Sequence, residues 1–159
     1  MFRPMRRIKQ QLDNSDCLEI LNTEKRGVLS IIGDDGYPYG IPINFYFSEP
    51  DNKIYFHGAR KGHKIDSIMK NDKACLSVFN KGIQSNVKKG LDVKSVIIFG
   101  RIKIVNDDDK IRQACANLAA RFTFANKEYI EEEIKKFVNA VAVLELSIEH
   151  MTGKIVNES

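Results

Sequence analysis

The sequence predicts a mainly β (α+β) protein whose antiparallel strands form a barrel or strongly curved sheet with flanking helices. About six segments rich in β-branched and aromatic residues are separated by turn-forming residues, as expected of antiparallel strands. The helical patterns fall between or outside these strands and do not alternate with them. No G-x-G-x-x-G motif opens a helix after a strand, which disfavours a dinucleotide-binding α/β fold.

The first elements are a short helix and a strand. Ser15 or Asp16 is a suitable N-cap for a helix that ends near Gly27. Consecutive apolar residues at 28–32 then begin a strand. The Gly-Asp-Asp-Gly stretch at 33–36 tolerates positive φ angles, so it predicts a hairpin turn.

The next segments continue as a β-meander. Residues 37–47 form a long strand segment in which the prolines at 38 and 42 imply bends or a sheet edge. After a turn at 50–52, polar and apolar residues alternate over 53–57, which predicts a half-buried strand.

A helical period follows. Ile65, Ile68 and Met69 share one face of a short helix that begins near His63. Residues 73–79 and 93–105 are then predicted strands, and the Lys- and Gly-rich segment 80–92 is predicted to be a mobile loop.

The last third of the chain predicts two helices and a closing strand. Asp107 to Asp109 form an acidic helix start. The apolar face of that helix consists of Ile111, Ala114, Cys115, Leu118 and Phe122. A second helix covers 127–138, and a strand covers 140–148. Thr152 and Gly153 are predicted to turn into a final short strand.

Length and charge set limits on the class of protein. The 159 residues fit a single domain spanning 1–159. The net charge of +4 is mildly basic, but acidic residues are spread among the basic ones, which argues against a general nucleic-acid-binding surface. A β-barrel that binds single-stranded nucleic acid is a minor alternative, because aromatic residues stand between basic ones.

The sequence also bears on the compartment. No segment has the roughly 20 apolar residues that crossing a membrane requires, and the basic N-terminus is not followed by an apolar run like that of a signal peptide. Cys17, Cys75 and Cys115 stand apart within apolar patterns, which predicts reduced thiols packed in the core of a cytoplasmic protein. No metal site is expected, because the histidines and cysteines lack short ligand spacings.

The densest chemical signal is the segment 54–66. It combines a strand, a glycine loop with several basic residues, and the start of a helix. Free N–H groups and the positive dipole end of a helix favour a phosphate, and Arg60, Lys61 or Lys64 can supply charge. A solvated basic loop is the alternative. A Walker loop fits poorly, because Ile65 occupies the place of the Ser or Thr that would bind magnesium.

Five segments in this order resemble one family. They are GDDGYPYGIPINFY (33–46), IYFHGA (54–59), GHKID (62–66), NDKACLSV (71–78) and SVIIFG (95–100). Together they are similar to the pyridoxamine 5'-phosphate oxidase-like flavoproteins, and within them to the branch that contains the nitroimidazole resistance proteins. The resemblance covers roughly Met5 to Lys154.

The resemblance implies a six-stranded antiparallel split β-barrel that forms a homodimer and binds FMN at the subunit interface. Pro42, Ile43, Asn44 and Phe45 would lie along the flavin ring; His57, Gly58 and Ala59 would approach the ribityl chain and phosphate; His63 and Lys64 would bind the phosphate; and Ser95 and Val96 would come from a neighbouring strand. His63 departs from the oxidase subgroup, which has arginine there. The chain also lacks the basic C-terminal pattern of true oxidases, so vitamin B6 oxidation is disfavoured.

Such a protein would be an FMN-dependent oxidoreductase. FMN would carry the redox chemistry, with NADH or NADPH as the electron donor and a small acceptor such as a nitroaromatic compound or a quinone. No side chain is singled out as a catalytic acid or base. The alternative is a flavin- or haem-binding module that stores, delivers or senses its ligand without turnover.

Overall fold

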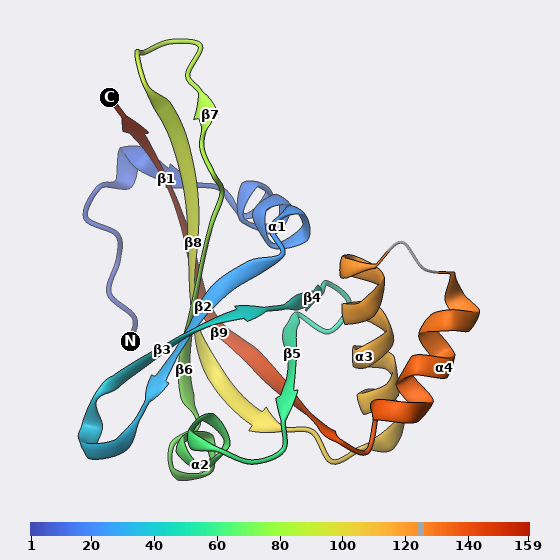
Figure 1. The fold of residues 1–159 in the computed structure, drawn as a ribbon. Helices are drawn as coiled ribbons and strands as arrows, with labels where there is room; N and C mark the ends of the chain where they lie inside the picture. Colours follow the sequence, from blue (N-terminus) through green and yellow to red (C-terminus); the bar gives the residue numbers. More distant parts are fainter. Residues whose placement is uncertain (124–125) are drawn as a thin grey trace.

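The computed structural model describes residues 1–123 and 126–159 (Figure 1). Its helices are η1 (Ile8–Gln10), α1 (Asn14–Thr23), η2 (Asp34–Gly36), α2 (His63–Lys70), α3 (Asp108–Phe122) and α4 (Lys127–Phe137). Its strands are β1 (Gln11–Leu12), β2 (Arg26–Ile32), β3 (Pro38–Asn44), β4 (Tyr46–Ser48), β5 (Lys53–Ala59), β6 (Lys73–Phe79), β7 (Ile83–Gln84), β8 (Leu91–Ile104) and β9 (Val141–Glu158).

The strands form one antiparallel sheet that curls into a half-barrel. The order across the sheet is β3-β2-β6-β8-β9-β5-β4, and the two-residue strands β1 and β7 attach to β9 and β8. β3 and β4 belong to one stretch of chain, yet β3 pairs with β2 and β4 pairs with β5. This stretch therefore connects the two ends of the sheet, and six long strand segments surround the core. The predicted mainly β, antiparallel architecture is confirmed.

The inner face of the half-barrel carries the main hydrophobic core. Leu29, Leu76 and Ile98 lie opposite one another on β2, β6 and β8, and each is fully buried. The helix α2 contributes Ile65 and Ile68 to the same core, as its spacing predicts. Met69 of that helix is instead exposed, because its position lies just beyond the buried stripe.

A second, smaller cluster lies on the other side of β5. Helices α3 and α4 cover this side (Figure 1), and Ile111 of α3 packs with Tyr55 of β5 and Val143 of β9. The expectation of a half-buried strand at 53–57 is therefore wrong for its middle, because both Tyr55 and Phe56 are buried.

Three further expectations are corrected. The N-cap of α1 is Asp13, whose carboxylate accepts a hydrogen bond from the Asp16 N–H at 2.9 Å. The segment 80–92, predicted to be a loop, contains the short strand β7, which pairs with the start of β8. Thr152 and Gly153 do not turn: β9 runs through them, because Gly153 pairs with Val96 on one side and Leu12 on the other.

The three cysteines are free thiols with unequal burial. Cys17 is buried, as expected, whereas Cys75 and Cys115 are only half-buried. Cys75 lies opposite Phe99 on the outer face of the sheet, and Cys115 faces α4 rather than the main core. Within residues 1–123 and 126–159, no helix is long and apolar enough to span a bilayer.

Candidate functional site

The start of α2 leaves backbone donors without a side-chain cap. Gly62 precedes the helix with a φ of +116°, which favours glycine, and no side chain caps the helix. Helical hydrogen bonding begins with the N–H groups of Ile65 and Asp66, which both donate to the Gly62 carbonyl. The N–H groups before them are the orphan donors that a helix N-terminus offers to an anion.

Lys64 brings a positive charge to this helix start. Its side chain is half-buried, and its Nζ lies so close to Gly58 of β5 that a Cβ at position 58 would approach it to 2.7 Å. Burial lowers the pKa of the Lys64 ammonium. Among the residues that the structure describes, no carboxylate or other acceptor pairs with this ammonium.

His57 is the second basic group at this end of β5. Although its side chain reaches solvent, desolvation by its neighbours lowers its pKa, and the charge of Lys64 lowers it further. A protonated His57 would therefore repel the Lys64 ammonium beside an uncapped helix start. An anion bound between them would relieve this repulsion, so these residues fit the phosphate group predicted for the site.

The side chain of His63 contacts β3 and the β2–β3 turn, whereas that of Lys64 lies beside Gly58. Its ring stacks on Tyr39 of β3, with centroids 4.3 Å apart and planes 12° apart. Its Nε2 is 3.4 Å from both the N–H and Oδ2 of Asp34 in the β2–β3 turn. The imidazole thus links α2 to this turn, and 43% of it remains exposed.

Arg60 is directed away from the helix start. Its Nε donates to the Val141 carbonyl at 3.1 Å, and its Nη2 is 3.5 Å from the Val138 carbonyl. These bonds connect the end of β5 to the start of β9. Of the basic residues that the sequence offered for the anion, Lys64 is therefore the one that lies half-buried beside Gly58.

The predicted flavin-ring segment lies at an edge of the sheet. Among the described strands β3 pairs with β2 alone, so its other edge presents backbone groups that no described strand pairs. Pro42 is exposed there, while Ile43 and Asn44 are half-buried. Phe45 is fully buried, and the Arg121 guanidinium lies 5.4 Å from the centre of its ring. Phe45 is therefore not accessible to a ligand at the surface.

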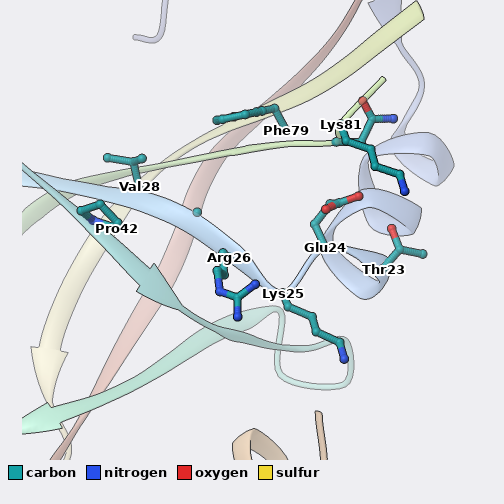
Figure 2. A pocket seen from close by; sticks show the side chains of 10 residues that line it. Thr23, Glu24, Lys25, Arg26, Val28, Pro42, Phe79 and Lys81 are labelled. Atoms are coloured by element: carbon teal, nitrogen blue, oxygen red, sulfur yellow. The ribbon is translucent and has the colours of Figure 1, made fainter. Parts of the chain in front are cut away.

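Pro42 also lines an open cleft of about 590 Å³ between the end of α1, the start of β2 and the end of β6 (Figure 2). The other lining residues are Thr23, Glu24, Lys25, Arg26, Gly27, Val28, Phe79, Asn80 and Lys81. The sequence analysis missed these basic and aromatic residues. These residues come together because β2 pairs with β6, which no local pattern predicts. The hairpin predicted at 33–36 could have placed only Arg26, which lies opposite Asn44.

The remaining predicted flavin contacts are Ser95 and Val96 on β8 and Ala59 at the end of β5. Ser95 of β8 is half-buried and pairs with Phe79, a residue of the cleft. Val96 is fully buried in the core. Ala59 is exposed at the end of β5, opposite Val141. The structure thus brings Ser95 close to the cleft, and it keeps the Val96 side chain away from any surface ligand.

Sequence comparison identifies the family. A family model described as pyridoxamine 5'-phosphate oxidase matches residues 13–155. The chain belongs to this family. The match covers the helix start at Gly62 and the long strands from β2 to β9, except for the last three residues of β9. None of the curated proteins matches the chain in sequence.

Solved structures of this family type share the fold. A protein assigned to 5-nitroimidazole antibiotic resistance from Bacteroides thetaiotaomicron has a TM-score of 0.75 at 22% identity, over 91% of this chain and 86% of that one. An FAD-binding protein from Mesorhizobium loti has a TM-score of 0.68 at 20% identity, over 93% and 98%. An FAD- and haem-binding protein from Mycobacterium smegmatis has a TM-score of 0.67 at 18% identity, over 94% and 74%. The predicted split barrel is therefore confirmed.

Proposed function

We propose that this member of the pyridoxamine 5'-phosphate oxidase family is a cytoplasmic flavoprotein that binds FMN. The observation that carries the proposal is the pair of Lys64 and His57 beside the uncapped start of α2. In this assignment, the phosphate accepts hydrogen bonds from the helix N–H groups and from Lys64. Gly58 leaves room for this contact because it has no side chain beneath Lys64.

The flavin ring lies along β3 in this proposal. The unpaired edge of β3 offers backbone groups to the polar edge of a flavin ring, and Pro42 and Ile43 offer apolar surface. Asn44 adds an amide at the same edge. These residues would hold and orient the ring, and the bound flavin would supply hydride and electron transfer.

The proposed dimer uses the outer face of β6 and β8. Ile97 and Phe99 of β8 point outward there, and each is 40% exposed. An exposed apolar face on a curved sheet is typical of a protein interface. A second copy covering this face would bring Ser95 of each subunit close to the interface, where the resemblance expects the flavin.

The proposed activity is oxidation of NADH or NADPH with reduction of a small acceptor such as a nitroaromatic compound. Similarity to a protein assigned to 5-nitroimidazole resistance favours this acceptor class. The test uses protein reconstituted with FMN and measures NADH and NADPH oxidation with and without a nitroaromatic compound or a quinone. We expect a rate that depends on the acceptor. Flavin-loaded protein with no such rate would exclude the enzymatic proposal.

A non-catalytic flavin- or haem-binding module is the second candidate. Similarity to an FAD- and haem-binding protein favours it. Binding of FMN, FAD or haem without acceptor-dependent oxidation of the nicotinamide cofactor would support this candidate. Mass identification of the bound group distinguishes FMN from FAD.

A further inference from the structure

The cleft beside Pro42 carries basic side chains that the proposed FMN contacts do not use. Lys25, Arg26 and Lys81 line it, and Glu24 is the one carboxylate among the lining residues. Within residues 1–123 and 126–159, none of these three cations forms an ion pair. Lys25 lies over the ring of Phe122, 5.8 Å from its centre. The cleft therefore has three cations against the one carboxylate of Glu24, and no ion pair among the described residues offsets this excess of positive charge.

Apolar groups occupy another part of the same cleft. Figure 2 shows Val28 and Pro42 at one end, Lys81 with Glu24 and Thr23 at the other, and Arg26 between them. Phe79 adds an aromatic ring that is 60% exposed. An exposed aromatic ring beside unpaired cations suits a ligand that joins a flat base to phosphate groups. The volume of about 590 Å³ is in the range of nucleotide-sized ligands.

The position of the cleft narrows the choice of ligand. Pro42 belongs both to the cleft and to the proposed flavin-ring segment, so an occupant of the cleft lies next to the flavin. The electron donor of a flavin enzyme must make that contact. NADPH differs from NADH by a 2'-phosphate, and guanidinium and ammonium groups distinguish the two by binding that phosphate.

We infer that this cleft binds the nucleotide electron donor, and that Arg26 and Lys81, assisted by Lys25, select NADPH over NADH. The inference rests on the proposed function, because it takes the flavin ring to lie along β3. It concerns binding and selectivity at residues 25, 26 and 81.

The test compares two charge-matched double variants. Arg26→Gln with Lys81→Gln removes two charges from the cleft. Lys88→Gln with Lys89→Gln removes two charges from the β7–β8 hairpin, which does not line the cleft. Lys25 is left in place because of its contact with Phe122. The flavin absorbance of each protein is recorded first, and adenosine 2',5'-bisphosphate and AMP are then titrated calorimetrically into flavin-loaded protein and apoprotein.

We expect the native protein to bind the bisphosphate at least about tenfold more tightly than AMP, since charge-assisted contacts to a phosphate have that magnitude. The preference should weaken with added salt. It should disappear in the cleft variant and persist in the hairpin variant. The ratio of kcat/KM for NADPH to that for NADH should follow the same pattern.

Three results would overturn the inference. The native protein could lack the preference for the bisphosphate, or the two double variants could lose it equally, which would indicate net charge alone. Loss of flavin from the cleft variant would show that these cations bind the flavin phosphate instead. Failure of the proposed function has a different signature, since native protein would then lack flavin absorbance before any titration. The apoprotein titration still tests the cleft in that case.

Discussion

Replacement of Lys64 by methionine separates the effect of its charge on the stability of the apoprotein from its effect on FMN binding. Lys64→Met keeps the length and apolar stem of the side chain but removes a half-buried ammonium that has no partner among the described residues. Since burial lowers the pKa of Lys64, the folded apoprotein disfavours the charged form, and the variant apoprotein should be at least as stable as the native one. FMN binding should nevertheless weaken.

The size of the FMN effect follows from the contact that is lost. One charge-assisted hydrogen bond to a phosphate contributes about 1.5–3 kcal/mol, which corresponds to a roughly 10- to 150-fold increase in Kd. Lys70→Met is the matched control: it lies on the same helix, but its ammonium is 72% exposed and only 3.3 Å from the exposed Asp34 carboxylate. Such a surface pair contributes little, so the control should bind FMN normally.

Titration of FMN into apoprotein, followed by flavin fluorescence, measures both variants, and the absence of tryptophan from the chain simplifies the signal. Thermal unfolding of the apoproteins reports their stability. Native affinity in Lys64→Met, or an equal loss in both variants, would refute the assignment of the phosphate to this helix start.

Three other predictions follow from particular residues. The lowered pKa of His57 should give an NMR titration midpoint below 6.5 in the apoprotein, and bound FMN should raise this midpoint. As the pH falls below about 6.5, His57 is protonated in the unfolded chain before it is protonated in the folded protein, so the free energy of unfolding should decrease slightly. A midpoint at or above 6.5 in the apoprotein would contradict the desolvation of His57 and its repulsion by Lys64. Gly100→Ala should lower the free energy of unfolding by about 1–3 kcal/mol in denaturant titrations, because a Cβ there would collide with the Ser147 carbonyl. Gly40→Ala is the control and should have a smaller effect, because the nearest atom to its Cβ would be 3.4 Å away. Phe99→Glu on the outer face should convert the proposed dimer to a monomer in light scattering, whereas Val87→Glu, 91% exposed on the β7–β8 hairpin, should not. A native protein that is already monomeric would exclude the proposed dimer.

Much of the fold could be predicted because its signals are local. The periods of two and 3.6 residues identified the strand at 73–79 and the helix after Asp107, and the Gly-Asp turn identified the first hairpin. The course of β9 could not be predicted in this way. Thr152 and Gly153 are turn-forming residues, but pairing on both sides keeps them extended, and the absence of a side chain at Gly153 lets Leu12 and Cys17 pack against it.

The candidate site was predictable where it depends on one segment. The glycines and basic residues of 58–64 indicated an anion site, which stays a prediction; Lys64 lies beside Gly58, and no residue of 1–123 or 126–159 forms an ion pair with it. The direction of Arg60 toward Val141 depends on how β5 meets β9, which no local pattern encodes. The basic cleft likewise depends on the β2–β6 register, which places Arg26 and Phe79 near each other across strands distant in sequence.

The absorbance spectrum of the purified protein, with mass identification of any group released on denaturation, tests the central claim most directly. We expect flavin absorbance bands and release of FMN, with the bands restored when FMN is added back to the apoprotein. Colourless protein that does not take up added FMN would contradict the account.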